Sequence, residues 1–498
     1  MNLPAFVWLM LIPALAAVLA YLVGRIVHGA KAWYLPCVIT LMGLMGAWVP
    51  FVQTAGALAQ GVAEQYTLGS LTLRMDGLGL LLTAVALVLG TLVVIFSGPD
   101  LARETGQEKF YAMLPLMISM IIGLACATDL FNMWIWFETM AVTSYLLVAF
   151  YRNQPAALEA GFKYLVQSAA GSVLIVTGIA VVFAATGSVN LDLLRQVAKP
   201  SAELIAAGAL FIVGFGVKTA LVPMHTWLPD AHSQAPSGIS AMLSGVVIEA
   251  GLVVLMRTLG ALVAVSSSWS VLLMGFGAVN MLVGNLMALR QKQVKRLLAY
   301  SSVAQIGYML LGLGIALYSG QADGAQGGFF HLFNHGLMKG LAFLSAGVLL
   351  YSLHTGRGDH RPLLIDELSG AAKRYPLAAL ALSLAVLGLG GLPPLAGFMS
   401  KWQIFSAGFE TRNVWLEWLV VFAALNSVLS LAYYMPLINA MYRLEPSARV
   451  EGGVNMPKVM GVPLVVLSLA VIALGVWPGL MNWLTLPAAQ AFLRNLGG

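Results

Sequence analysis

The sequence predicts an all-α, polytopic membrane protein with about fourteen transmembrane helices. Hydrophobic residues make up 60% of the 498 residues, charged residues make up only 9%, and the mean hydropathy is +0.87. Soluble domains carry about 25% charged residues. Because a soluble core cannot bury this much apolar surface, lipid must be the solvent for most of it. The net charge of +6 indicates loops that face a membrane or a protein partner rather than nucleic acid.

Apolar runs of about twenty residues mark the expected spans. In chain order they are 3–24, 33–53, 77–97, 110–128, 130–151, 161–186, 203–226, 238–260, 268–289, 297–318, 327–352, 376–406, 415–440 and 460–483. The segments between them are too short for a soluble domain. We therefore expect one membrane domain over residues 1–498.

The basic residues test this division of the chain, because cytoplasmic loops are rich in lysine and arginine. With the N-terminus outside, sixteen fall in cytoplasmic loops: Arg25, Lys31, Arg103, Lys109, Arg152, Arg290, Lys292, Lys295, Arg296, Arg357, Arg361, Lys373, Arg374, Arg443, Arg449 and Lys458. Six fall on the outer side: Arg74, Arg195, Lys199, Arg257, Arg412 and Arg494. This bias predicts a multi-pass protein of a prokaryotic cytoplasmic (inner) membrane with both termini on the outer side.

Cofactor and metal motifs are missing from the sequence. Cys37 and Cys126 lie inside apolar runs, without a second Cys or a His at metal-ligand spacing. We interpret both as small core residues. No glycine-rich nucleotide loop, Ser-His-Asp arrangement or zinc signature occurs. We therefore expect no cofactor and no metal in this chain.

Two spans are interrupted by proline or glycine close to a lysine. The seventh contains Lys218 and Pro223, and the twelfth contains Gly390-Gly391-Leu392-Pro393-Pro394 followed by Lys401. A matched pair of interrupted spans is typical of transporters built from inverted repeats that meet at a central pathway. Two ordinary proline kinks are the alternative. The lysine at each break favours the pathway, because a charge at this depth is costly.

Several ionisable residues fall inside the expected spans. Glu138 lies in the fifth span, Lys218 in the middle of the seventh and Glu249 in the eighth. Desolvation favours a neutral lysine and a nearby carboxylate favours a charged one, so a Glu138–Lys218 pair would be a switchable proton site. Glu249 could hold a proton or balance a lysine. For both glutamates, a structural hydrogen bond between helices is the alternative.

The eleventh span carries a column of titratable groups. His331, His335 and Lys339 follow one another at i, i+4 and i+8, so they share one helix face over about 12 Å. Imidazole passes protons through its two nitrogens near neutral pH, which favours a proton relay. A metal site is the competing hypothesis, but Lys339 would repel a cation. Further polar groups that could hold water are Ser301, Ser302, Gln305 and Asn334.

Three more residues are weaker or less specific candidates. Lys163 lies near the cytoplasmic end of the sixth span, where it either snorkels or joins the pathway. His225 could pass protons to Lys218, about two turns away if the helix continued. Lys401 is either an exit gate or a snorkelling anchor.

These residues sit in stretches with a family resemblance. The stretches are FETMAVTSYLL, ALEAGFKYL, VKTALVPMHTWLPDAHSQAPSGISAMLSG, KRLLAYSSVAQIGYM, FHLFNHGLMKGLAFLSAG and GLPPLAGFMSKW, spread over residues 130–405. The chain resembles the antiporter-like membrane subunits shared by respiratory complex I, membrane-bound hydrogenases and Mrp-type cation/proton antiporters, and among these it looks most similar to the MrpD type. The resemblance implies two inverted five-helix repeats, here 110–260 and 268–440, with broken seventh and twelfth helices.

The resemblance also implies roles for single residues. The family's fifth-helix glutamate falls on Glu138, its seventh-helix lysine on Lys218 and its twelfth-helix lysine on Lys401. Its connecting groups fall on His331, His335 and Lys339, and together these residues are expected to form a hydrated polar axis. Many relatives carry a lysine in the eighth helix, where this sequence has Glu249.

We therefore expect a proton-translocating or Na⁺/H⁺-exchanging subunit of a larger membrane complex, relaying H⁺, and possibly Na⁺, through buried Glu, Lys and His. Its partners would be other membrane subunits and the lipid bilayer. It would be a non-redox subunit of an oxidoreductase or hydrogenase, or of a cation/proton antiporter. The alternatives are an autonomous transporter of a small solute and a transport-inactive structural subunit.

Overall fold

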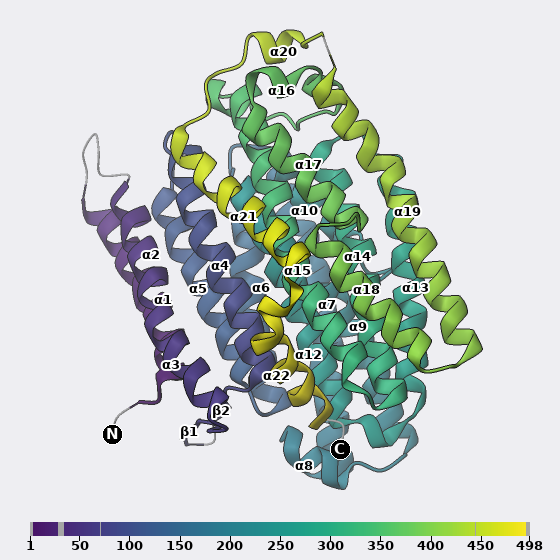
Figure 1. Cartoon of the computed structure of the whole chain (residues 1–498). Helices are drawn as coiled ribbons and strands as arrows, with labels where there is room; N and C mark the ends of the chain where they lie inside the picture. Colours follow the sequence, from purple (N-terminus) through teal and green to yellow (C-terminus); the bar gives the residue numbers. More distant parts are fainter. Residues whose placement is uncertain (1–2, 28–33, 70, 444, 495–498) are drawn as a thin grey trace.

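A bundle of long apolar helices makes up the computed structural model, which describes residues 3–27, 34–69, 71–443 and 445–494 (Figure 1). Lys31, counted above among the cytoplasmic cations, lies outside these ranges. The α-helices are α1 (Ala5–Ile26), α2 (Tyr34–Gly46), α3 (Trp48–Ala59), α4 (Gly77–Asp100), α5 (Gln107–Cys126), α6 (Leu130–Val148), α7 (Pro155–Thr186), α8 (Leu191–Val197), α9 (Ala202–Thr219), α10 (Trp227–Gln234), α11 (Ser237–Met242), α12 (Ile248–Ala261), α13 (Ser268–Ala288), α14 (Val294–Ser319), α15 (Ala322–Leu353), α16 (Ala371–Arg374), α17 (Pro376–Gly390), α18 (Ala396–Glu410), α19 (Val414–Tyr442), α20 (Ala448–Glu451), α21 (Lys458–Val476) and α22 (Asn482–Arg494).

Shorter elements complete the chain. An antiparallel hairpin pairs β1 (Gln65–Leu68) with β2 (Leu71–Arg74). A π-helical segment, η1 (Leu243–Val247), joins α11 to α12. Short 3-10 turns are η2 (Val263–Val265), η3 (Thr355–Arg357), η4 (Asp366–Leu368) and η5 (Pro478–Met481).

In the described residues, twelve helical segments are long and apolar enough to cross a membrane. They coincide with twelve of the expected spans, so the polytopic all-α prediction is confirmed. The fifth expected span is the 19-residue helix α6, which is less apolar. The twelfth is divided between α17 and α18, each of 15 residues. The count of fourteen and the inverted repeats stay predictions.

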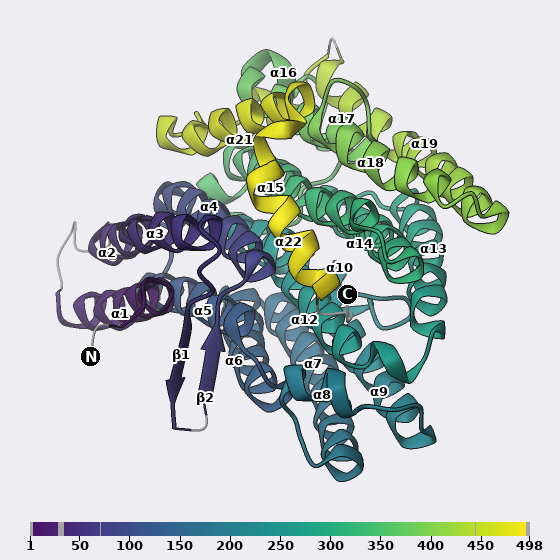
Figure 2. The same cartoon turned by 60° about the horizontal axis from the view of Figure 1, so that its bottom comes forward.

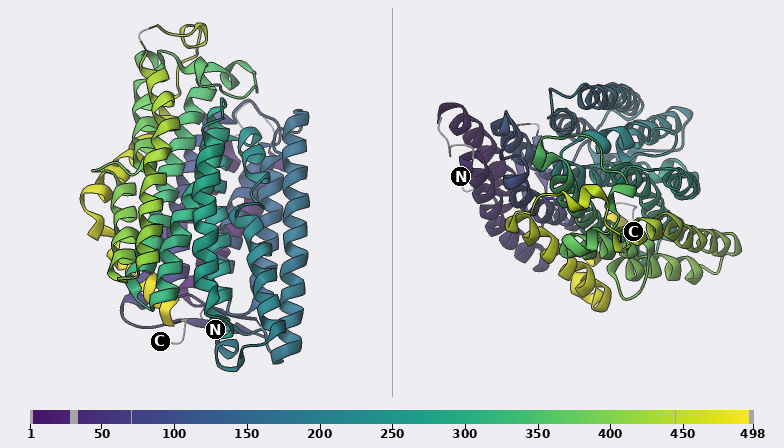
Figure 3. Two further views of the ribbon diagram at one scale, coloured as in Figure 1. Left: turned by 90° about the vertical axis from the view of Figure 1, so that its right-hand side faces the viewer. Right: turned by 90° about the horizontal axis from the view of Figure 1, so that it is seen from above.

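The centre of the bundle consists of α4, α11–α12, α14 and α15, whose apolar stretches are almost entirely buried. Helices α1–α3 lie on one flank, and α13 and α19 lie on the opposite flank (Figure 1). Figures 2 and 3 show that both chain ends lie at the same end of the bundle, together with the hairpin and α8. The short helices α16 and α20 lie at the other end.

Local sequence signals explain where the helices begin and end. Asp76 caps α4 by accepting a hydrogen bond of 2.7 Å from the Gly79 amide, and Asp129 caps α6 through the Asn132 amide at 2.8 Å. Helix α7 begins at a proline and is followed by Gly187, whose φ of +73° suits a residue without a Cβ.

Both expected helix breaks are present. Helix α9 ends at Thr219, and helix α17 ends at Gly390. Asn280 accepts a hydrogen bond of 2.8 Å from the Val222 amide and donates one of 3.2 Å to the Ala220 carbonyl. At the second break, Lys401 donates to the Leu389 carbonyl at 2.7 Å. Side chains therefore satisfy backbone groups that the breaks release at membrane depth.

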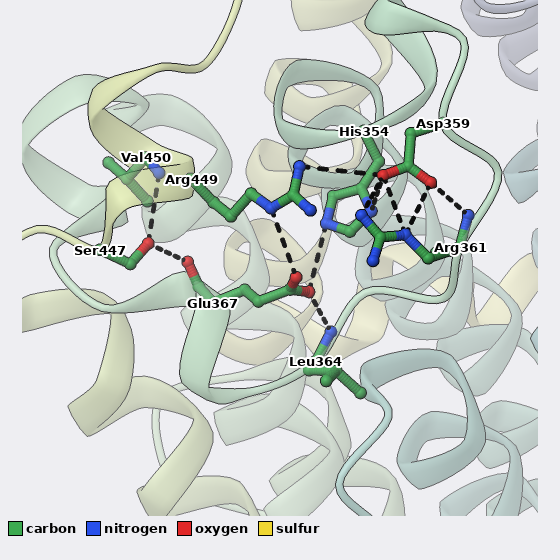
Figure 4. Close-up of polar contacts among 8 residues, drawn as sticks. All are labelled: His354, Asp359, Arg361, Leu364, Glu367, Ser447, Arg449 and Val450. Carbon is green, nitrogen blue, oxygen red and sulfur yellow. Dashed lines mark hydrogen bonds and ion pairs between the residues drawn. The ribbon is translucent and has the colours of Figure 1, made fainter.

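A polar cluster ties two linkers together at the end opposite the termini (Figure 4). Buried His354, which follows α15, lies 3.2 Å from the Glu367 carboxylate and 3.7 Å from that of Asp359. Arg449 of α20 reaches the same carboxylates at 3.9 Å and 3.8 Å. The hydrogen-bonded Arg361 guanidinium holds the pKa of the Asp359 carboxyl well below its usual range. Asp359 therefore stays ionised, and the linker stays anchored to α20.

The second break packs directly against α21 at Gly475. A Cβ on Gly475 would collide with the backbone of Pro394 and Leu395. We expect Gly475→Ala to destabilise the protein by about 1–3 kcal/mol, because backbone cannot move aside as a flexible side chain can. Gly275→Ala on α13 is the matched control, since no atom lies within 4 Å of its added Cβ. The melting temperatures in detergent check this; equal values for the two variants would contradict it.

Candidate functional site

Lys218 occupies the last turn of α9, directly before the first break, and is buried. Its Nζ donates to the Tyr164 hydroxyl at 2.7 Å and to the Ser144 hydroxyl at 3.4 Å. The ring of Tyr164 lies beneath the ammonium, 4.4 Å from Nζ, and stacks on Trp227 at 3.8 Å. Because the Trp227 indole donates to the Val217 carbonyl at 2.7 Å, the break itself holds this aromatic platform in place.

Glu138 of α6 lies within electrostatic range of Lys218, as predicted. Within the described ranges, however, no ion pair joins the two side chains. The Phe137 ring lies 5.7 Å from the lysine Nζ, and the Glu138 Oε1 atom is buried without a hydrogen-bond partner in the described structure. The two groups thus face a common region, while Lys218 is held by neutral hydroxyl groups.

Glu249 bonds to His335 in the centre of the bundle. Its Oε1 lies 2.7 Å from the His335 Nδ1, and both side chains are fully buried. The expectation that Glu249 would pair with Lys339 or Lys218 is therefore wrong. The reason is a close helix approach: a Cβ on Gly245 would lie 2.9 Å from the Gly336 carbonyl oxygen, so only glycine lets η1 reach α15.

The π-helical segment η1 ends one residue before α12, and Glu249 is the second residue of that helix. A π turn inserts an extra residue and changes the face on which the following side chains lie, and such turns are frequent at functional sites. The sequence carries no signal that predicts it. The free atoms of the pair, Oε2 of Glu249 and Nε2 of His335, have no hydrogen-bond partner among the described residues.

The column on α15 is confirmed as one buried set of side chains. The rings of His331 and His335 have centroids 6.4 Å apart. His331 contacts the Ser400 hydroxyl at 2.9 Å and the Gln305 amide oxygen at 3.0 Å. Lys339 donates to the Leu298 carbonyl at 2.8 Å and to the Ser301 hydroxyl.

Lys401 of α18 closes the row beside the second break. It is 2% exposed, so the alternative that it snorkels to a surface is wrong. Its Nζ donates to the Leu389 carbonyl at 2.7 Å and to the Ser427 hydroxyl at 2.8 Å, and lies 4.2 Å from the Tyr308 ring centroid. The carbonyl end of α17 attracts a cation. Lys401 therefore has the same kind of environment as Lys218: a hydroxyl and a tyrosine ring beside a broken helix.

The two weaker candidates lie apart from this row. Lys163 has a half-exposed side chain that pairs with Glu159 at 2.8 Å and with Asp230 of α10 at 3.2 Å. The helix expected to connect His225 to Lys218 ends at Thr219, so the two-turn spacing does not apply. His225 instead lies beside Tyr300, with ring centroids 6.2 Å apart.

Sequence reasoning missed His232 and Lys295. His232 is fully buried and stacks on Phe343 at 4.6 Å, within electrostatic range of both Lys295 and Lys339. Neither ring nitrogen of His232 has a hydrogen-bond partner in the described part of the chain. Lys295 donates to the Ala235 carbonyl at 2.6 Å and interacts with Asp100. Lys295 is counted above as a loop cation; its place at the start of an apolar span is the available signal.

A helical membrane bundle with two broken helices and a buried row of lysine, histidine and glutamate is the architecture of an antiporter-like membrane subunit. The chain belongs to the NADH:quinone oxidoreductase/Mrp antiporter transmembrane family, whose model matches residues 127–430.

Curated relatives match over most of their length. The chain is 33% identical over 463 residues to F(420)H(2) dehydrogenase subunit N of Methanosarcina mazei, which covers 91% of this chain and 92% of the relative. It is 32% identical over 426 residues to NADH-quinone oxidoreductase subunit N of Desulfitobacterium hafniense, covering 82% and 84%.

Solved structures agree. A chain of the membrane-bound sulfane sulfur reductase, an archaeal respiratory membrane complex, superposes with a TM-score of 0.86 at 28% identity, covering 99% of this chain and 100% of that chain. A chain of the Mrp complex from Dietzia sp. also gives 0.86, over 100% of both chains, and at 21% identity this likeness shows the fold alone. The protein is thus an antiporter-like subunit whose partners are other membrane subunits.

Proposed function

We propose that this chain translocates protons across a membrane as one subunit of a larger complex. The observation that carries the proposal is the buried row formed by Lys218, the Glu249–His335 pair, Lys339 and Lys401. Buried ionisable residues inside membrane spans are costly and mark ion pathways.

The partners of the lysines support reversible proton binding. Lys218 and Lys401 are held by hydroxyl and carbonyl oxygens rather than by a bonded carboxylate. Losing a proton from such a lysine leaves no unpaired buried anion, which would cost several kcal/mol. Glu138 lies close enough to change the charge preference of Lys218 without fixing it. A change in a neighbouring subunit that moves Glu138 would thereby load or unload Lys218.

The proposed order of transfer runs from Glu138 and Lys218 to the Glu249–His335 pair, then through Lys339 and His331 to Lys401. His232, Lys295 and Asp100 form a side branch from Lys339 toward the end of the bundle rich in basic loops. The serine and amide groups beside Lys339 and His331 are suited to hold the water that completes such a chain.

The chemistry of the row favours H⁺ over Na⁺. Most of its ionisable groups are lysines and histidines, which bind protons through nitrogen and repel a metal cation. Hard metal cations prefer several oxygen ligands, and Glu249 directs one of its carboxylate oxygens to His335.

Energy would come from other subunits, because we propose that this chain supplies no cofactor of its own. We also propose a cytoplasmic-membrane location with both termini outside, since the basic loops gather at the opposite end. A C-terminal alkaline phosphatase fusion should be active in cells; an inactive but expressed fusion would contradict this orientation.

The proposal is tested by purifying the native complex and reconstituting it in sealed vesicles. We expect pumping driven by the complex's own substrate, read from an entrapped pH dye, at the same rate when K⁺ replaces Na⁺. A requirement for Na⁺ would support Na⁺/H⁺ exchange instead. Solute transport by the lone chain in vesicles would contradict the subunit assignment.

A further inference from the structure

A cavity of about 640 Å³ lies at the end of the bundle that carries both termini. It is formed by α3, the connection from β2 to α4, and helices α8 and α22. One wall is apolar and includes Leu58, Leu80 and Trp483. The polar side carries Arg74, Arg195 and Arg494. We call this cavity the arginine pocket; none of its residues belongs to the buried row.

The arginine pocket has an excess of positive charge. Arg74 and Arg195 share a single carboxylate, that of Asp192, at 2.9 Å and 2.5 Å. The other carboxylate of the pocket, Asp76, is held by Arg257 at 2.5 Å. Counting Arg494, four guanidinium groups therefore face two carboxylates.

Arg195 is the guanidinium with unused capacity. Burial lowers the pKa of Arg195, the charges of Arg74 and Arg257 lower it further, and Asp192 opposes them. Its Nε is buried without a hydrogen-bond partner in the part of the chain that the structure describes. An anion at this position would relieve the repulsion and accept the free N–H. Guanidinium forks suit phosphate, which they bind through paired hydrogen bonds.

The apolar wall indicates what the anion is attached to. Leu58 and Leu80 belong to α3 and α4, which continue into the membrane, so the wall extends from the pocket toward the acyl region. Trp483 of α22 is 54% exposed, and tryptophan is enriched at the level of lipid headgroups. An apolar wall below a group of arginines matches an amphiphile with an anionic head.

We propose that the arginine pocket binds one anionic phospholipid, with its phosphate at Arg195 and Arg494 and an acyl chain along Leu58, Leu80 and Trp483. Basic pockets between membrane helices bind anionic headgroups by this chemistry. The lipid site is independent of proton transfer, so either proposal can fail without the other.

The experiment uses Trp483 as the reporter. The purified complex is placed in phosphatidylcholine vesicles that contain a minor fraction of phosphatidylglycerol with brominated acyl chains, which quench nearby tryptophan. The difference between the parent and Trp483→Phe isolates the signal of this one residue. We expect stronger quenching of Trp483 by brominated phosphatidylglycerol than by the same amount of brominated phosphatidylcholine.

Charge variants locate the headgroup. Arg494→Gln, at an exposed helix end, should weaken the preference for phosphatidylglycerol about tenfold, since a charge-assisted hydrogen bond is lost. Arg195→Gln combined with Arg494→Gln should abolish it. Lys199→Gln is the control, because it removes a nearby exposed cation that does not line the pocket.

Three outcomes would overturn the proposal. Equal quenching by the two brominated lipids would show that the arginines do not select a headgroup. Displacement of the lipid by an equal concentration of inorganic phosphate would identify a site for the free anion. Quenching in the isolated chain that disappears in the complex would show that a neighbouring subunit fills the pocket.

Discussion

Replacing Lys218 by methionine is expected to slow proton translocation about a hundredfold or more, because general acid–base groups contribute on this scale. Methionine keeps the length and apolar volume of the lysine stem but cannot carry a proton. The fold should survive, because the Tyr164 and Ser144 hydroxyls that lose the ammonium still bond to each other at 2.8 Å. No buried hydroxyl is then left without a partner. Vesicle acidification per assembled complex measures the effect.

Lys163→Met is the matched control for this prediction. It makes the same chemical change on α7, within the same family stretches, but at a half-exposed lysine that pairs with Glu159 and Asp230. We expect translocation to stay within about twofold of the parent, because exposed ion pairs contribute little. Equal losses in the two variants would remove Lys218 from the pathway, and normal pumping by Lys218→Met would do the same.

Glu249 allows a second large effect to be separated from its structural role. Glu249→Gln keeps an oxygen and a similar shape beside His335 but cannot release a proton. We expect translocation to fall by at least about tenfold, as for loss of a proton-transfer group, while thermal stability stays within about 1 kcal/mol of the parent. Pumping at the parent rate would show that Glu249 only orients His335.

Glu249→Lys introduces the residue that many relatives carry in the eighth helix, and here it should act differently. It removes the acceptor of His335 and puts a second cation near Lys339 in a fully buried cluster. Breaking a buried charged pair costs about 3–5 kcal/mol. We therefore expect a markedly lower melting temperature and reduced assembly for this variant but not for Glu249→Gln. Equal melting temperatures of the three proteins would contradict the Glu249–His335 bond.

The sequence alone was sufficient for several features. The long apolar runs predict the membrane bundle, because a chain with so few charges can only fold in lipid. The proline and glycine runs predict both helix breaks, since the backbone cannot continue a helix through them. The spacing of His331, His335 and Lys339 places them on one face by the helical period, and all three are buried.

Other features were decided only by the tertiary structure. Glu249 meets His335 because glycines at 245 and 336 let two segments of distant sequence approach, and because a π turn changes the face on which Glu249 lies. Lys295 becomes a buried group beside His232, although its neighbours in sequence read as a charged loop. Hydropathy and periodicity describe one helix at a time. The partner of a buried polar group depends instead on how closely and at which rotation two helices pack, and the arginine pocket, drawn from four separate segments, has the same origin.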